Sequence, residues 1–456
     1  MKRHVFIGHF GPGDLTEVPL GADERPTKLD FLSNDQTIDY GIGHALVDLD
    51  RLGVHPPERS IDLLTLAAHV HAADTRVSRD SEAQDGWTRE LRLVVPVSDP
   101  DLWYSVAPTF RRMLNFLTGD KWTLQFRLRS GQFASAGPTG QQDLGFPQFD
   151  TVALFSGGLD SLIGAVNLLE QGRTPLLISH AGDPAASEAQ TKLHDALITE
   201  YVGRAFNRLR VWLTFPDSLV EDSAGEPTTR GRSFLFFALG VFAGTGLPEP
   251  ATLLVPENGL IALNVPLDPL RLGALSTRTT HPFYIARWND ALQQLDLGMT
   301  IENPYWDKTK GEMVRQCANR ELIKQLASTS ISCSSPSKGR WQGLGIQQCG
   351  YCLPCLIRRA SLASGLHPDP DPTTYTLQDL TGQILDTQEA EGVQIRSFQF
   401  AIDRIRARPE LASVLIYKPG PLSDVSPENL NVLADLYRRG LTEVGDLLED
   451  VRTRPV

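Results

Sequence analysis

Two short segments of this 456-residue chain carry residue types and spacings that can do chemistry. The first, SGGLDS at 156–161, lies between an apolar run and a segment with helical periodicity. Adjacent glycines let the backbone turn tightly and present N–H groups to an anion, and the N-terminus of the following helix adds positive potential. The spacing is not that of a Walker loop, and an ordinary Gly-Gly turn with a serine cap is the alternative. The predicted phosphate-binding residues are Ser156, Gly157, Gly158, Leu159, Asp160 and Ser161, with Asp160 also placed to hold a metal ion.

The second segment is a cysteine cluster. Cys349, Cys352 and Cys355 form two overlapping C-x-x-C steps, and Cys333 lies upstream at loop distance. Four thiolates are the tetrahedral set that zinc prefers, so these residues predict a closed structural zinc site. An iron–sulfur cluster takes the same ligands, whereas disulfides are disfavoured in a chain with only five cysteines and no signal peptide. The fifth cysteine, Cys317, is expected to be a buried core thiol.

The elements that must position these residues are clearest in the middle of the chain. Apolar runs at 151–155, 175–179, 210–215, 251–255 and 299–304 predict strands. Helical patterns at 161–171, 187–206, 233–244 and 284–295 separate them. This alternation predicts a doubly wound parallel sheet, in which ligands bind beyond the carboxyl ends of the strands near the switch point. The segment SGGLDS directly follows the first of these strands.

Three blocks and a linker make up the predicted domain organisation. Residues 1–130 are expected to form an α+β domain, with 60–77 as a core helix or strand, strands at 88–97 and 122–129, and a helix at 101–117. Residues 131–148 are a Gly/Ser/Gln-rich linker, and 149–365 hold the predicted sheet and the cysteines. Residues 366–456 follow a Pro-rich break as a helical extension, with a helix end predicted at Gly440 and a packing or partner-docking role.

Composition limits the classes of function. The chain is 41% hydrophobic and 21% charged, with a net charge of −12. It has no run of 18 apolar residues, and its N-terminus is too short and too charged for a signal peptide. We therefore expect a cytoplasmic globular protein with no membrane partner. We also expect no obligate nucleic-acid partner, since the net charge of the chain is negative and basic residues are not in excess.

Four motifs together resemble a known family. SGGLDS combined with CGYCLPCLIRRASL at 349–362 is similar to QueC, the 7-cyano-7-deazaguanine synthase family of PP-loop ATP pyrophosphatases. NPYWDKTKGEMVRQC at 303–317 resembles that family's Pro…Lys-x-Glu stretch, and PTTRGRSFLFFALG at 227–240 resembles its Arg-x-x-Phe-Leu helix start. The resemblance spans about half the chain, from 149 to 365. The extra blocks on either side and the long Cys333–Cys349 spacer resemble the QueC-like proteins of bacterial antiphage operons, most closely the QueC-like component of the Qat system.

This resemblance implies a PP-loop fold that uses ATP, Mg²⁺ and Zn²⁺. The implied reaction adenylates the carboxylate of 7-carboxy-7-deazaguanine, releases pyrophosphate and forms an amide, with the amine belonging to a partner protein from the same operon. Ammonia as the amine, giving 7-cyano-7-deazaguanine, is one alternative; a tRNA-modifying enzyme or a non-catalytic nucleotide-binding scaffold are others. The implied catalytic residues are Asp160, Ser161 and Lys310, and Arg232 is implied as a phosphate contact.

Residues for a deazaguanine substrate are expected at the end of the 251–255 strand and in the loop after it. Glu257 and Asn258 lie where a sheet edge would meet the pocket, and a carboxylate there can accept from two N–H groups of a guanine-like ring. Arg271 and Arg278 can each form a fork onto a substrate carboxylate. Loop structure and ion pairing are the alternative roles for both arginines.

Overall fold

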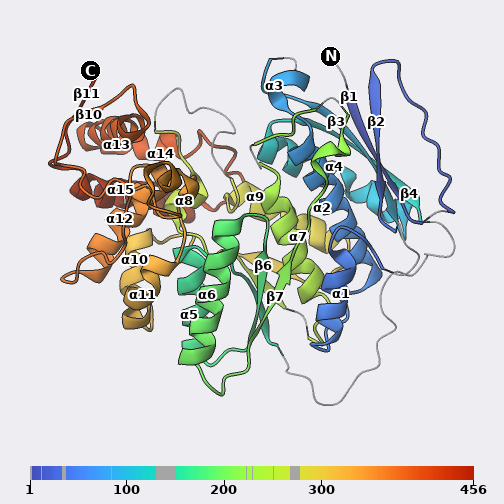
Figure 1. Ribbon diagram of the computed structural model, residues 1–456, viewed down its shortest axis with the longest axis horizontal. Helices are drawn as coiled ribbons and strands as arrows, with labels where there is room; N and C mark the ends of the chain where they lie inside the picture. Colours follow the sequence, from blue (N-terminus) through green and yellow to red (C-terminus); the bar gives the residue numbers. More distant parts are fainter. Residues whose placement is uncertain are drawn as a thin grey trace.

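The computed structural model describes residues 3–455 except 12, 33–36, 84, 130–148, 222, 228–229, 250 and 268–277. The predicted linker 131–148 therefore lies outside the described residues. The chain contains two parallel sheets with helices packed on them, so the α/β class is confirmed. Figure 1 shows the N-terminal sheet at one end of the molecule, the C-terminal helices at the other and the second sheet between them. Among the described helices, none has both the length and the apolar character needed to cross a membrane.

The five-stranded sheet carries the predicted phosphate-binding segment. Its order is β7-β6-β5-β8-β9 and every neighbouring pair is parallel, an arrangement compatible with a doubly wound fold. The chain adds strands on one side of β5 and then on the other, so the order reverses between β5 and β8. All five predicted strands exist, although the one predicted at 210–215 begins and ends earlier. They are β5 (Thr151–Leu154), β6 (Pro175–His180), β7 (Asn207–Val211), β8 (Thr252–Leu254) and β9 (Thr300–Glu302).

Helices cover both faces of this sheet because both faces of its strands are apolar. Val152 and Leu154 join the hydrophobic cluster of the α7 face, whereas Ala153 and Phe155 join the cluster of the α5 face. Successive side chains of a strand point to opposite faces, so the uninterrupted apolar run at 151–155 needs a helix on each side. The helices are α5 (Leu159–Glu170) and α6 (Pro184–Glu200) on one face, and α7 (Arg232–Gly244) and α9 (Pro282–Gln294) on the other.

The first block is a parallel α/β unit, so the α+β prediction for it is wrong. Its sheet has the order β2-β1-β3-β4 with only parallel pairs. Parallel neighbouring strands must be joined by crossover connections, which here are helices. The sequence predicted strands and helices in this block but not the relative direction of the strands. The strands are β1 (Arg3–His9), β2 (Glu24–Asp30), β3 (Glu90–Val97) and β4 (Lys121–Leu128); the helices are α1 (Ile42–Asp50), α2 (Glu58–Arg76), α3 (Arg79–Glu82) and α4 (Pro100–Thr118).

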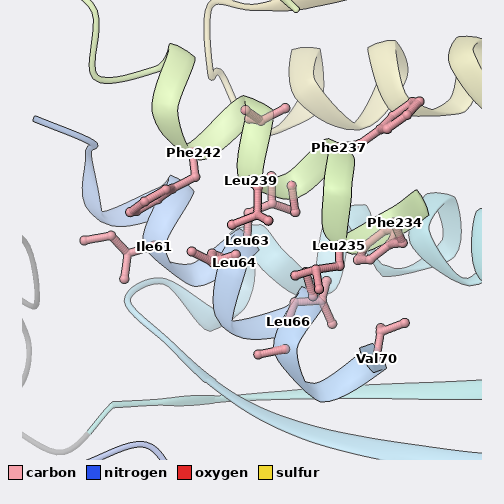
Figure 2. Close-up of a cluster of buried hydrophobic side chains, with 14 of the residues drawn as sticks. Ile61, Leu63, Leu64, Leu66, Val70, Phe234, Leu235, Phe237, Leu239 and Phe242 are labelled. Atoms are coloured by element: carbon pink, nitrogen blue, oxygen red, sulfur yellow. The ribbon is translucent and has the colours of Figure 1, made fainter. Parts of the chain in front are cut away.

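The apolar segment 60–77 forms a fully enclosed helix. Residues 60–75 of α2 are all buried, since the helix packs against β1 and β3 on one side and against α7 on the other. Figure 2 shows apolar side chains of α2 facing Leu235, Leu239 and Phe242 of α7. Most of the buried residues of α2 are apolar, as is typical of a helix enclosed on all sides, although Asp62, His69 and Asp74 lie among them. Burial lowers the pKa of His69 to about 4 and that of His71 to about 3, so both imidazoles are neutral at pH 7.

A buried ionic cluster joins the first block to the start of α7. The Arg89 guanidinium donates to Asp74 at 2.8 Å and to Asp120 at 2.7 Å, and Arg79 donates to Asp120 at 2.6 Å. The other oxygen of Asp74 accepts from the backbone N–H of Gly231 at 2.6 Å, where α7 begins. Helix α2 of the first block, through Asp74, thus fixes the start of a helix that covers the second sheet.

The C-terminal block has its own hydrophobic cluster, which also includes the cysteine segment and α8 (Gly259–Leu263). The predicted helix end at Gly440 is wrong, because α15 continues through this residue and packs it against Leu260. The remaining α-helices are α10 (Lys310–Gln316), α11 (Arg320–Leu326), α12 (Leu353–Leu366), α13 (Ala390–Ala407), α14 (Ala412–Leu415) and α15 (Pro427–Leu447). Short elements complete the chain: 3₁₀ turns η2 (Asp217–Leu219), η4 (Ala327–Thr329), η5 (Pro336–Gln342) and η6 (Pro409–Leu411), and the paired strands β10 (Leu385–Asp386) and β11 (Thr453–Arg454).

Candidate functional site

The turn between β5 and α5 is held by its own hydroxyl groups. Ser161 Oγ donates to the Gly158 carbonyl at 3.0 Å and accepts from the Ser156 N–H at 3.2 Å. Ser156 Oγ in turn accepts from the Gly158 N–H at 3.3 Å. The turn lies at the carboxyl end of β5, beside the point where the strand order reverses. This is the place where ligands bind in open parallel sheets.

Gly157 is required by the geometry of this turn. Its φ of 83° lies in the left-handed region, and a Cβ there would lie 3.0 Å from the carbonyl oxygen of Ala186. The Gly157 carbonyl accepts from the Ile331 N–H at 2.9 Å, which ties the turn to the segment that leads into the cysteine cluster. Both sides of the turn are therefore occupied by backbone, and a side chain has no room.

Asp160 and Lys310 form a buried ion pair at the start of α5. Lys310 Nζ lies 3.1 Å from Asp160 Oδ1, and both side chains are largely shielded from solvent. Asp160 Oδ2 accepts from the backbone N–H of Asn258 at 3.1 Å and from its side-chain amide at 2.8 Å. Both carboxylate oxygens of Asp160 are therefore engaged: Oδ2 by Asn258 and Oδ1 by the Lys310 ammonium.

Asn258 therefore supports Asp160 instead of facing a substrate. It is fully buried, and its side-chain oxygen accepts from the Ile261 N–H at 3.1 Å as the N-cap of α8. With its amide nitrogen on Asp160 and its oxygen on α8, both ends of the side chain are engaged. The structure places this predicted substrate residue behind the site.

A cavity of about 720 Å³ opens beside the ion pair. Its volume is within the range of small-molecule sites. Its walls include the polar groups of the turn and of Lys310, residues of the cysteine segment and the first turn of α13. We call it the site cavity; its main lining residues are Ser156, Gly158, Asp160, Glu257, Lys310, Ser332, Lys338, Tyr351, Cys352, Leu353, Gln388, Val393 and Gln394.

Glu257 lines the site cavity, as predicted for a residue at the end of β8. Its carboxylate accepts from the Thr280 hydroxyl. Burial disfavours the charged form and raises the pKa of Glu257 to about 7; the nearby charge of Asp160 acts in the same direction, whereas the Thr280 hydrogen bond and Lys310 oppose it. At neutral pH this carboxyl group can therefore either donate or accept a hydrogen bond in the cavity.

The raised pKa of Glu257 predicts a pH-dependent contribution to stability. The folded protein keeps the proton up to about pH 7, whereas the unfolded chain releases it near the ordinary value of 4.5. The contribution is therefore complete below pH 4.5 and is lost as the pH rises through 7, amounting to about 3 kcal/mol. We expect urea denaturation to show that the free energy of unfolding of the wild type falls between pH 4.5 and 7.5, and that this fall is absent in Glu257→Gln. The control Glu200→Gln, at an exposed position on α6, should keep the slope; identical profiles for wild type and Glu257→Gln would contradict the assignment.

The predicted arginines lie away from the site cavity. Arg278 donates to the Phe116 carbonyl at 2.8 Å and its guanidinium stacks 4.7 Å from the Phe116 ring centroid, so it joins α4 of the first block to the second sheet. Arg271 lies outside the described residues. Arg232 is the first residue of α7; burial lowers its pKa and the negative charge of Asp183 opposes that shift. Neither Arg232 nor Arg278 lines the site cavity.

The four predicted metal ligands come together, as expected. The Sγ atoms of Cys333, Cys349, Cys352 and Cys355 all lie within 4.8 Å of one another, and all four are free thiols. The Cys333–Cys352 and Cys349–Cys355 Sγ distances are 3.9 and 3.8 Å. Zinc bonded to four sulfurs at about 2.3 Å requires an edge of about 3.8 Å, so the cluster can hold a metal ion such as zinc.

Backbone N–H groups around the cluster are arranged for thiolates. Cys333 Sγ accepts from the N–H groups of Ser335 and Cys349 at 3.4 Å, and Cys349 Sγ accepts from the Cys352 N–H at 3.3 Å. Donors aimed at sulfur stabilise its charged form. Cys352 is also part of the wall of the site cavity, so the cluster adjoins the candidate ligand site.

Sequence reasoning missed the contribution of the C-terminal block. Gln388, Val393 and Gln394, at and before the first turn of α13, line the site cavity together with Lys338 and Tyr351. Their residue types are ordinary for solvent-facing helices, and no spacing within 366–456 marks them. The helical pattern read from the sequence begins at Phe398, so the first turn of α13 was not predicted, nor the surface it would face.

No family model matches this chain, and the comparison with curated proteins found no match either.

Proposed function

We propose that this protein is a QueC-like PP-loop ligase of antiphage defence that acts in the cytoplasm. The proposed reaction adenylates the carboxylate of 7-carboxy-7-deazaguanine at the expense of ATP and then forms an amide with an amine of a partner protein. The observation that carries the proposal is the convergence of the SGGLDS turn, Asp160 and Lys310 at the strand-order reversal, beside a cavity of ligand size. The Cys₄ cluster in the wall of that cavity supports it further.

In the first step, a substrate carboxylate oxygen attacks the α-phosphorus of ATP, and the bond to the bridging oxygen breaks to release pyrophosphate. Negative charge accumulates on the leaving group, so catalysis depends on positioning and on nearby positive charge. The N–H groups of the turn and the Lys310 ammonium are the chain's own donors for this charge. Asp160, whose carboxylate lines the site cavity, is the residue that would hold a Mg²⁺ ion, which would add to this neutralisation when bound.

In the second step, the amine attacks the acyl carbon and AMP leaves with the former carboxylate oxygen, giving an amide and one released proton. No protein nucleophile is required, because both bonds form between substrates. Glu257 is the proposed contact to the N–H edge of the deazaguanine ring, since it faces the cavity and can accept hydrogen bonds when ionised. The Cys₄ cluster is proposed to hold zinc as a structural ion that shapes the cavity wall.

The direct test measures pyrophosphate and AMP after mixing the protein with ATP, Mg²⁺ and 7-carboxy-7-deazaguanine. We expect release that depends on the carboxylate, so 7-deazaguanine, which lacks that group, is the matched control. Mass spectrometry of candidate partner proteins from the same operon then identifies the amine through a deazaguanine adduct. Equal pyrophosphate release with both heterocycles, or none with either, would overturn the proposed activity.

A further inference from the structure

The N-terminus of α10, the helix that carries Lys310, is held by a side chain from the C-terminal block. Glu443, on α15, accepts from the Thr309 hydroxyl and from the Gly311 N–H at 3.3 Å. Thr309 and Gly311 flank Lys310, and Thr309 is the N-cap of α10. One carboxylate therefore holds the chain on both sides of the lysine.

A second contact from α15 supports the same turn. Arg439 donates to Glu312 and, at 3.1 Å, to the Asp307 carbonyl. Glu312 completes the capping box of α10, because its other oxygen accepts from the Thr309 N–H at 2.9 Å. Four residues along α15 from Arg439 to Glu443 is about one helical turn, so the two side chains contact α10 from one face of α15.

The packing leaves little freedom between these elements. A Cβ on Gly311 would lie 2.5 Å from Glu443 Oε1, and a Cβ on Gly440 would lie 2.8 Å from Leu260 Cδ2. Leu260 belongs to α8, which begins just after Asn258, the residue that holds Asp160. Thus α15 contacts α10, which carries Lys310, and α8, whose N-cap residue Asn258 holds Asp160.

We propose that α15 is a working part of the active site and that Glu443 is a positioning residue for Lys310. A lysine side chain has four rotatable bonds, so its ammonium group stays at a fixed point only if its backbone is held and its stem is packed. Glu443 fixes the backbone, and burial fixes the stem: Lys310 is only 6% exposed. The C-terminal block then acts on the reaction through Lys310, a role beyond docking a partner. The catalytic part of this inference rests on the proposed function.

The variant Glu443→Gln tests the inference because it keeps the shape of the side chain and removes its charge. It also turns an amide N–H₂ group toward one of the two donors. We expect about a 10-fold lower kcat for pyrophosphate release with an unchanged KM for ATP, since misplacement of one charge affects the transition state more than binding. In a Lys310→Met background, the same change should cause no further loss of kcat. Asp446→Asn, which removes an exposed charge elsewhere on α15, is the matched control and should leave kcat unchanged.

A second readout does not depend on activity. Limited acetylation followed by peptide mass spectrometry reports the accessibility of Lys310, with Lys308 on the same peptide as internal reference. We expect Lys310 to be protected in the wild type and in Asp446→Asn, and to react several-fold faster in Glu443→Gln. Changed acetylation in a protein that releases no pyrophosphate would keep the positioning role and reject the proposed function. Unchanged acetylation, or an additive loss of kcat in the double variant, would overturn the role of Glu443.

Discussion

Lys310→Met is expected to lower carboxylate-dependent pyrophosphate release by about 100-fold or more, the usual cost of removing one donor to developing negative charge. Methionine keeps most of the apolar stem, so packing around α10 is preserved while the ammonium group is lost. The effect should be concentrated in kcat, because charge on the leaving pyrophosphate develops as the bond to the α-phosphorus breaks. Steady-state kinetics with saturating heterocycle and varied ATP separate kcat from KM.

The matched control for this variant is Lys308→Met. Lys308 lies just before α10 and its ammonium group is 3.5 Å from Asp307, outside the site cavity. It should retain activity within about 2-fold, as is usual for a partly exposed ion pair. Equal kcat values for wild type and Lys310→Met would remove Lys310 from the mechanism. A loss of the same size in both lysine variants would point to a general effect of charge.

Cys355→Ser is expected to abolish stoichiometric metal binding and to destabilise the protein by about 3 kcal/mol or more, because binding of a structural metal is part of the folding free energy. Cys355 is fully buried in the first turn of α12, within the hydrophobic cluster of the C-terminal block. Losing the ion should therefore loosen α12 and the cavity wall at Tyr351 and Cys352 together. Elemental analysis of the purified protein gives the metal content, and urea denaturation gives the stability.

Cys317→Ala separates metal loss from the loss of a buried thiol. Cys317 is also buried, but it packs in the cluster of α5 and α10 and is not part of the Cys₄ group. This variant should keep one metal ion and lose about 1 kcal/mol, the cost of deleting one small buried group. A Cys355→Ser protein with full metal content and unchanged stability would contradict the predicted metal site. Iron in place of zinc in the wild type would favour the iron–sulfur alternative.

Much of the second sheet and both chemical clusters could be predicted from the sequence, because their signals are local. The run at 151–155 has to be buried on both faces, and its neighbours repeat the same strand–helix pattern. The C-x-x-C steps bring three thiols within reach of one another whatever the rest of the chain does. Glu257 lies two residues after a predicted strand, so its place at the carboxyl edge of the sheet also follows from local pattern.

Tertiary structure alone decided the features that depend on contacts between distant segments. Strand direction in the first sheet depends on how its crossovers pack, and local periodicity is the same for parallel and antiparallel strands. Arg278 and Asn258 have side chains suited to binding a substrate, but in the folded chain Arg278 donates to the Phe116 carbonyl and Asn258 donates to Asp160. Glu443 and Thr309 are 134 residues apart in the sequence, and no pattern in either segment predicts their contact. A polar side chain forms its hydrogen bonds with whichever groups the fold places beside it. The pattern of residue types therefore predicted where the candidate site lies, whereas long-range packing determined which side chains line it.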